Sequence, residues 1–141
     1  MFGLNFKLTN LQSAIGVAQL ARLDARLERQ RRIHADYVDA LAGVGGVTLP
    51  GFDLAGGECP LWTDAVVERR DELDRYLRER DMDCRRFWHP IHRQPPYHAP
   101  DEAFPNSTRL APKAVWLPSA FTLSDGDVAA VSGAIRSFYA R

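Results

Sequence analysis

The sequence FGLNFKLTNLQSAIGVAQLARLD (residues 2–24) places a glycine-asparagine turn directly before a long helical pattern. Apolar residues continue at helical spacing to about residue 42, and Leu20, Leu27 and Tyr37 lie on this stripe. Thr9 or Asn10 can cap the helix, because either side-chain oxygen can accept a hydrogen bond from a free backbone amide. The pattern therefore predicts one helix over 10–42, which would be about 50 Å long.

A helix of that length exceeds the roughly 30 Å diameter of a small domain. Its first part, residues 11–21, is apolar on nearly every side, which is typical of a buried helix. We expect this part to pack against a second subunit or a further domain. Left uncovered, the same face should drive self-association.

The rest of the sequence alternates between short strands and helices. Strands are predicted over 61–67, 83–88 and 114–118, and helices over 69–81 and 124–141, with loops over 47–60 and 89–107. Ser124 with Asp127 resembles a capping box at the start of the last helix. The helical period predicts the inward residues of these two helices, namely Leu73 and Leu77 of the first and Val128, Val131, Ile135 and Phe138 of the last. This order predicts an α+β fold with a small sheet covered by helices, in one domain spanning 1–141.

Composition excludes several classes of function. Eighteen basic residues balance eighteen acidic ones, so no net charge favours nucleic acid or a membrane surface. No apolar run approaches the ~18–20 residues that span a bilayer, and no secretory leader opens the sequence. The two cysteines have no metal or redox spacing and are expected to be reduced. The expected location is cytoplasmic.

The segment FWHPIHRQPPYH (residues 87–98) is the richest candidate for chemistry. It is open to three interpretations: a metal site, a rigid proline-rich surface loop, or a loop that binds a sugar ring or nucleotide phosphate. The metal interpretation is the weakest, because prolines prevent a helix from aligning His89 with His92 and no carboxylate has ligand spacing. Trp88 and Tyr97 can stack on a ring or fill the core, whereas Phe87 is predicted to be a core residue. No catalytic residue is assigned, since no nucleophile motif or phosphate-binding glycine loop is found.

Two motifs in this order carry a family resemblance. GLNFKLTNLQSAIGVAQLARLD and RRFWHPIHRQPPY resemble the C-terminal region of the DegT/DnrJ/StrS-type sugar aminotransferases, especially the perosamine-synthase-like members. RRDELDRYLRERDMD, FPNSTRLA and VWLPSAFTLSDGDV continue the agreement. The resemblance implies the small domain of a fold type I aminotransferase that depends on pyridoxal phosphate (PLP). It also implies a dimer that transfers an amino group, usually from glutamate, to a nucleotide-linked keto-sugar.

The resemblance also implies roles for individual residues. Asn5 would reach the PLP phosphate of the partner subunit, and Lys7 would bind cofactor where the family commonly has arginine. Three residues, His89, His92 and Tyr97, match the loop that approaches the nucleotide-sugar, with Trp88 beside it.

One part of the family pattern is absent from this sequence. The family's Schiff-base lysine precedes the GLNF turn, so neither Lys7 nor Lys113 corresponds to it. We expect the chain to lack the large PLP-binding domain and to be inactive alone. It would act with a separate large-domain polypeptide or as a homodimer. The alternative is a stand-alone, non-catalytic nucleotide-sugar binding domain or a relic dimerisation domain.

Overall fold

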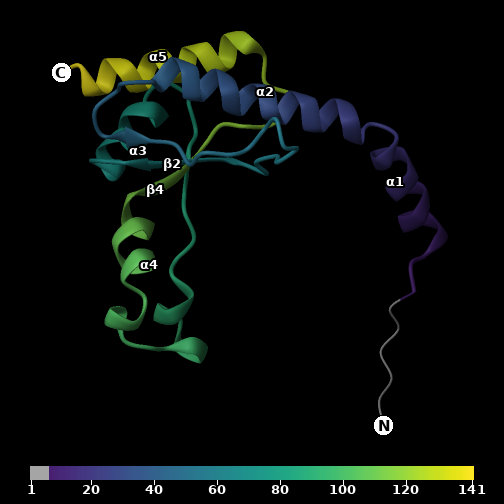
Figure 1. Cartoon of the computed structure of the whole chain (residues 1–141), viewed down its shortest axis with the longest axis horizontal. Helices are drawn as coiled ribbons and strands as arrows, with labels where there is room; N and C mark the ends of the chain where they lie inside the picture. Colours follow the sequence, from purple (N-terminus) through teal and green to yellow (C-terminus); the bar gives the residue numbers. More distant parts are fainter. Residues whose placement is uncertain (1–6) are drawn as a thin grey trace.

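The computed structural model describes residues 7–141 (Figure 1). Its main helices are α1 (Asn10–Leu20), α2 (Leu23–Leu41), α3 (Arg70–Arg78), α4 (Pro105–Leu110) and α5 (Asp125–Tyr139). Its strands are β1 (Val47–Thr48), β2 (Thr63–Val67), β3 (Arg85–Arg86) and β4 (Ala114–Leu117). In the described residues these strands form one antiparallel sheet in the order β1-β2-β4-β3.

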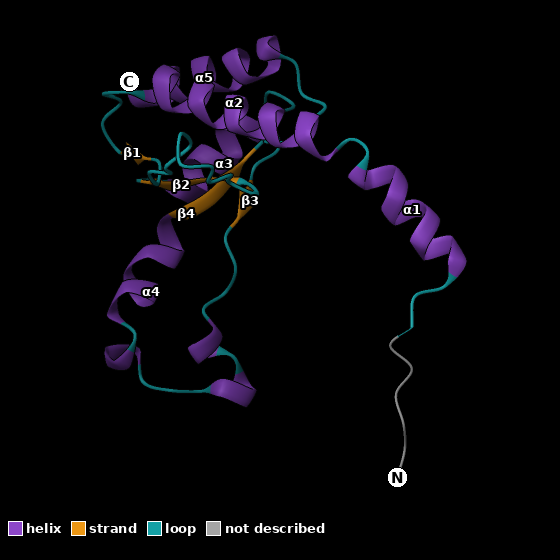
Figure 2. Ribbon diagram, turned by 45° about the vertical axis from the view of Figure 1, so that its right-hand side comes forward, coloured by secondary structure: helices purple, strands orange, loops and turns teal. Residues whose placement is uncertain are grey.

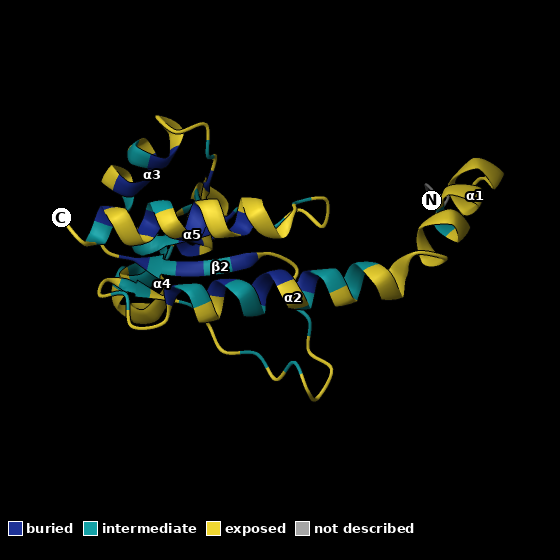
Figure 3. Ribbon diagram, turned by 90° about the horizontal axis from the view of Figure 1, so that it is seen from above, coloured by how far each residue is buried: buried dark blue, intermediate teal, exposed yellow. Residues whose placement is uncertain are grey.

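Helices cover one face of this sheet. Helix α5 lies between α2 and α3 and contacts both of them (Figure 3). The predicted α+β fold, a small sheet covered by helices, is therefore confirmed. Within residues 7–141, no helix combines the length and the apolar character needed to cross a membrane.

The core lies between the sheet and these helices. Strand β2 alternates, so that Thr63, Ala65 and Val67 are buried between intermediate residues. The hydrophobic residues of the core are Ile33, Tyr37, Leu41, Ala65, Val67, Leu73, Leu77, Cys84, Val115, Leu117, Val128, Val131, Ile135 and Phe138. Tyr37 is fully buried, and its hydroxyl donates to the carbonyl of Pro118 at 2.8 Å. The inward faces predicted for α3 and α5 are thus the observed ones.

The prediction of one continuous helix over 10–42 is wrong. The chain forms two helices, and the break falls at Ala21 and Arg22. The amide of Arg22 donates to the carbonyl of Gln19, so the last turn tightens to i→i−3 bonding and α1 ends. No residue of α1 is buried, and α1 projects away from the body of the fold (Figure 1). No tertiary contact with a core therefore holds α1 in line with α2.

The loop predicted over 47–60 contains one short strand. Residues Val47 and Thr48 pair with the end of β2 as an edge strand. They follow a turn in which Gly46 has a φ of 83°. A side chain at this position would also approach the ring of Tyr139 to 2.9 Å, so both backbone and space require glycine.

Residues 87–113, here called the arm, connect β3 to β4. The arm extends from the sheet on the side away from α2 and α5 (Figure 2). It contains four 3-10 turns, at Ile91–Arg93, Pro95–Tyr97, Asp101–Ala103 and Ala111–Lys113. It also contains α4, which begins with Pro105 in the first turn, so the prediction of wholly irregular structure over 89–107 is wrong. The predicted strand over 83–88 is limited to its two central residues.

Candidate functional site

The two sides of the arm enclose an open cleft of about 800 Å³. The outgoing side contributes Phe87, Trp88, His89, Pro90, Ile91, Gln94 and Tyr97, and the returning side contributes Ser107 and Ala111. The cleft wall therefore includes three of the four residues predicted to bind substrate, namely Trp88, His89 and Tyr97. The Gln94 side chain donates to the carbonyl of His89 at 3.3 Å and fixes the local backbone.

Aromatic rings gather where the arm leaves the sheet. Trp88 meets the edge of Trp116 at 5.1 Å between ring centroids, and the guanidinium of Arg85 lies 5.1 Å from the Trp88 ring centroid. Trp88 is 56% exposed and Tyr97 is 64% exposed, so both rings can accept a stacking partner. Phe87 is 39% exposed and touches Trp116 edge-on, so its prediction as a core residue is wrong. The strand at this point is too short to place Phe87 over the core.

His92, the fourth predicted residue, points into the interior of the arm. It is 5% exposed, and its ring stacks on Phe104 with a centroid distance of 4.8 Å. Its Nε2 lies 3.0 Å from Asp101 Oδ1 and 3.2 Å from Thr108 Oγ1. Since a carboxylate only accepts hydrogen bonds, Nε2 carries the proton and donates it. In this arrangement His92 joins the outgoing and returning sides of the arm.

Asp101 is the centre of this cluster. Its carboxylate accepts two hydrogen bonds from the Arg93 guanidinium, at 2.9 Å and 2.5 Å, in a bidentate contact. It also accepts the hydrogen bond from His92. The Arg93 guanidinium and the His92 imidazole hold the pKa of the Asp101 carboxyl well below its usual range. The pKa of Arg93 is raised by the same contact. The carboxylate stays charged at neutral pH and keeps the arm closed on itself.

The predicted cofactor residues lie at the other end of the chain. Asn5 is outside residues 7–141, and Lys7 is an exposed residue where the described part begins. Lys113 forms an ion pair with Glu68 at 2.7 Å and does not line the cleft. Among residues 7–141 no group of three or more His, Cys, Asp or Glu side chains has the arrangement of a metal site.

Several residues that shape the site carried no signal in the sequence. Asp101 and Thr108 lie nine and sixteen positions beyond His92, a separation that no helical or strand period connects. Trp116 reaches Trp88 because β3 and β4 are neighbours in the sheet. The sequence could have placed Trp116 beside Trp88 only through a prediction that the strands before and after the arm pair with each other.

A second hollow, here called the groove, lies beside the first turns of α2. It measures about 630 Å³ and is bordered by Leu23 and Leu27 on α2, by Trp62, and by Phe121. Trp62 stacks on Trp116 at 4.6 Å, and Arg26 lies 4.7 Å from the Phe121 ring centroid. The groove is mainly apolar, and it includes Leu23, the first residue of α2.

Comparisons with known proteins give consistent matches along the chain. The sequence model of the DegT/DnrJ/EryC1/StrS aminotransferase family matches residues 1–136. A GDP-perosamine synthase from Vibrio cholerae is 31% identical over 143 residues, covering 96% of this chain and 38% of that protein. The putative pyridoxal phosphate-dependent aminotransferase EpsN from Bacillus subtilis (strain 168) is 34% identical over 99 residues, covering 66% of this chain and 25% of that protein.

Solved structures share the fold. The structure of DesI in the presence of its TDP-sugar product superimposes with a TM-score of 0.85 at 27% identity, covering 99% of this chain and 38% of that chain. This chain thus spans little more than a third of the length of the proteins that it matches over nearly its whole length.

Proposed function

The chain belongs to the DegT/DnrJ/EryC1/StrS aminotransferase family, and from this premise we propose that residues 1–141 form the small domain of a PLP-dependent sugar aminotransferase. Its reaction would be amino transfer, with glutamate as the usual donor, to a nucleotide-linked keto-sugar. The observation that carries the proposal is the arm cleft, where exposed aromatic rings and an imidazole line about 800 Å³ of open space. Such a lining suits a ring-shaped, polar ligand.

The residues of the cleft divide into two roles. Trp88 and Tyr97 would stack on the nucleotide base or the sugar ring, and His89 would offer a hydrogen bond to a hydroxyl or phosphate. His92 would act indirectly, because its imidazole is already bonded to Asp101 and Thr108. Its part in binding is to hold the two sides of the arm together.

The described residues do not fit a complete PLP site. The cofactor supplies electron withdrawal in amino transfer and needs a lysine to bind it covalently. Lys113 is paired with Glu68 outside the cleft, and Lys7 belongs to the segment that leads into α1. We therefore derive no step through the cofactor. In the proposal, Asn5 and Lys7 contribute only to its phosphate, and a large domain supplies the lysine.

The large domain would lie on the same polypeptide or on another one, or the small domain would pair with a second copy. Helix α1 supports a partner of this kind, because Leu11, Ile15, Val17 and Leu20 are all more than half exposed. The groove is a second apolar surface, on the body of the fold. Monomeric proteins rarely leave apolar surface of this extent uncovered.

Calorimetric titration tests the ligand proposal on the chain itself. GDP- and dTDP-linked sugars should release or absorb heat, and Trp88→Ala should weaken binding by about tenfold through the loss of one stacked ring. The matched control is Phe121→Ala, which removes an exposed ring from the groove instead of the cleft. Absence of heat with every nucleotide-sugar, or equal weakening by both variants, would remove the ligand proposal.

Complementation tests the catalytic proposal separately. Co-expression with a PLP-binding large domain of the family should yield a complex that performs amino transfer, whereas the chain alone should be inactive. Neither a complex nor activity with any large domain would contradict the catalytic role. Ligand binding without complementation would favour the alternative, a stand-alone nucleotide-sugar binding domain.

A further inference from the structure

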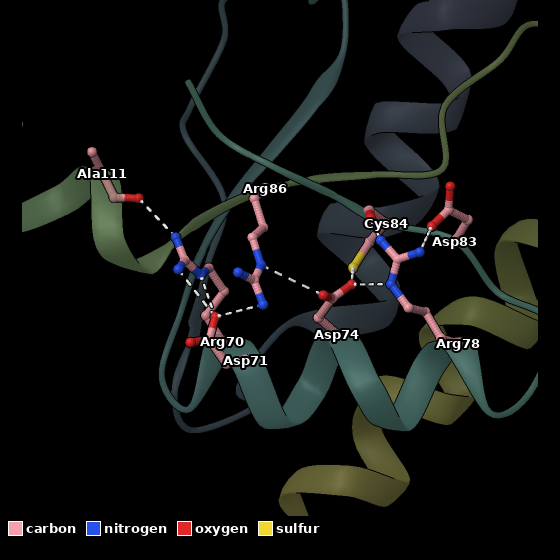
Figure 4. Close-up of polar contacts among 8 residues, drawn as sticks. All are labelled: Arg70, Asp71, Asp74, Arg78, Asp83, Cys84, Arg86 and Ala111. Atoms are coloured by element: carbon pink, nitrogen blue, oxygen red, sulfur yellow. Dashed lines mark hydrogen bonds and ion pairs between the residues drawn. The ribbon is translucent and has the colours of Figure 1, made fainter. Parts of the chain in front are cut away.

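A row of charged side chains on α3 reaches the point where the arm leaves the sheet (Figure 4). Its centre is Asp74, whose side chain is only 9% exposed. This carboxylate accepts a bond from Arg78 Nε at 2.9 Å and one from the Cys84 thiol at 3.4 Å, and it lies 3.6 Å from Arg86 Nε. Arg78 also donates to the carbonyl of Cys84 at 3.2 Å. We call residues 84–87 the outgoing stem of the arm and residues 111–114 its returning stem. Asp74 therefore contacts the outgoing stem at two places.

The same row reaches the returning stem. Asp71 lies 3.3 Å from Arg86 and 3.0 Å from Arg70. Arg70 in turn donates to the carbonyl of Ala111 at 3.2 Å. A continuous path of ion pairs and hydrogen bonds thus runs from the start of the arm, across α3, to its end (Figure 4). We call Arg70, Asp71, Asp74 and Arg86 the clamp.

Burial makes Asp74 the principal member of the clamp. Exposed ion pairs taken singly contribute little, and the Asp71 and Arg86 side chains are more than half exposed. The Asp74 carboxylate differs because it is buried and shared. Removing its charge takes one acceptor from Arg86, which keeps the exposed Asp71, and one from Arg78, which also pairs with Asp83. The stems are also joined directly, by the pairing of β3 with β4 and, next to it, by a bond from the amide of Phe87 to the carbonyl of Ala114 at 3.1 Å.

The clamp lies outside the cleft but next to its walls. No residue of α3 lines the cleft, whereas Phe87, directly after Arg86, and Ala111 both line it. A shift of either stem would therefore move a wall of the cleft. We propose that Asp74, with Asp71 and Arg70, positions the two stems of the arm and so sets the width of the cleft. What the cleft binds rests on the proposed function, whereas the positioning of the stems does not.

Hydrogen exchange measured on the intact chain tests the positioning. Asp74→Asn keeps the shape of the side chain and removes its charge, so the amide of Phe87 should exchange roughly tenfold faster. Amides of α2 and α5 should be unchanged. Asp74→Glu restores the charge and should restore most of the protection.

Two controls separate positioning from general destabilisation. Glu72→Gln makes the same charge change on the same helix, but Glu72 pairs with Arg69 and does not contact the arm. Ile135→Val weakens the core without touching the clamp. Neither control should open the stems selectively. Wild-type protection in Asp74→Asn, or faster exchange spread evenly over the whole chain, would overturn the proposal.

A second variant tests the returning stem, and it keeps the proposal testable if Asp74→Asn does not fold. Arg70→Gln removes the donor to the Ala111 carbonyl from a side chain that is only 18% exposed. It should speed exchange at residues 111–114 more than at the core helices. Unchanged exchange there would contradict the bridge across α3.

Binding provides a readout that a merely structural role would not move. If the chain binds a nucleotide-sugar, Asp74→Asn should weaken that binding by several fold, while Ile135→Val should not. Equal affinity in wild type and Asp74→Asn would show that the clamp does not set the cleft. If the wild type binds no nucleotide-sugar, the ligand proposal fails, and the exchange results still decide whether the clamp positions the arm.

Discussion

At the scale of single residues, His92 illustrates how structure can reassign a side chain. The sequence places it in a histidine-rich loop and suggests direct contact with a ligand. The fold buries it against Phe104 and engages its Nε2 with Asp101 and Thr108. A variant at His92 would therefore act on the shape of the arm, and variants at the exposed Trp88 or Tyr97 are better probes of binding.

The arm should loosen in acid because of Asp101. Its pKa is lowered in the folded protein by Arg93 and then by His92, so its contribution to stability is complete above the ordinary value of about 4. The contribution is lost as the pH falls below that value toward the folded pKa. Amide NMR signals of the arm should lose their native dispersion only below about pH 4.

Asp101→Asn is the control for this acid effect. It removes the titrating group, so the arm signals should already differ at pH 7 and should not follow the same acid transition. Signals of α5 should be native in both proteins near neutral pH. An acid transition of the arm that persists unchanged in Asp101→Asn would contradict the assignment.

The two cysteines should differ in reactivity. Cys84 is 2% exposed, and burial, followed by its hydrogen bond to Asp74, raises the pKa of the thiol to about 12. A disulfide reagent at pH 8 should therefore react rapidly with Cys59, which is partly exposed, and with Cys84 only after unfolding. Cys59→Ser should abolish the rapid phase. Two rapid thiols in the native protein would contradict this expectation.

At the scale of elements, α1 and α5 begin with the same capping motif but differ in how they pack. In α1, the Thr9 hydroxyl accepts a hydrogen bond from the amide of Gln12 at 3.2 Å. In α5, the Ser124 hydroxyl accepts one from the amide of Asp127 at 3.1 Å. Both are complete capping boxes. Helix α5 buries one face in the core, whereas α1 buries no residue.

This pair allows a matched test of what the caps stabilise. Ser124→Ala should lower the free energy of unfolding by about 1 kcal/mol, because α5 is part of the cooperative core. Thr9→Ala should reduce helix content in circular dichroism and leave the free energy of unfolding unchanged. Equal losses in urea unfolding would show that α1 folds with the core.

At the scale of the whole molecule, the chain consists of a packed body with two projections. Helix α1 projects at one end of α2, and the arm projects from the opposite face of the sheet (Figures 1 and 2). The body buries the core, whereas the projections present exposed apolar and aromatic side chains. The two projections are therefore the parts to which the proposed function assigns a partner and a ligand.

The surface of α1 should make the isolated chain self-associate. Leu11 and Ile15 lie one helical turn apart and are 72% and 54% exposed. Sedimentation velocity should show an average mass that rises with concentration, and Leu11→Asp with Ile15→Asp should return the chain to a monomer. Ser13→Asp adds charge to the same helix and is the control. A monodisperse wild-type monomer would contradict this expectation.

Local pattern and tertiary contact contributed differently to the fold. The helical period placed Leu73 and Leu77 on the inward face of α3, and it placed Val128, Ile135 and Phe138 inward on α5. The helical period alone does not show whether an apolar stripe packs against a core. For this reason the sequence predicted α1 and α2 as one continuous helix. Strand β1 was missed because two residues show no alternation and pair only through the edge of β2.

The sequence by itself determined the α+β class, the capping box at Ser124, and the family, because these follow from residue order and spacing. It left the cap of the first helix open between Thr9 and Asn10, and the structure shows Thr9. The tertiary structure alone decided which loop residues face the cleft and which are buried. His92 and Asp101, or Asp74 and Arg86, meet across separations that no local period connects. Their contacts depend on the pairing of β3 with β4 and on the packing of α3, both of which form only when distant segments come together.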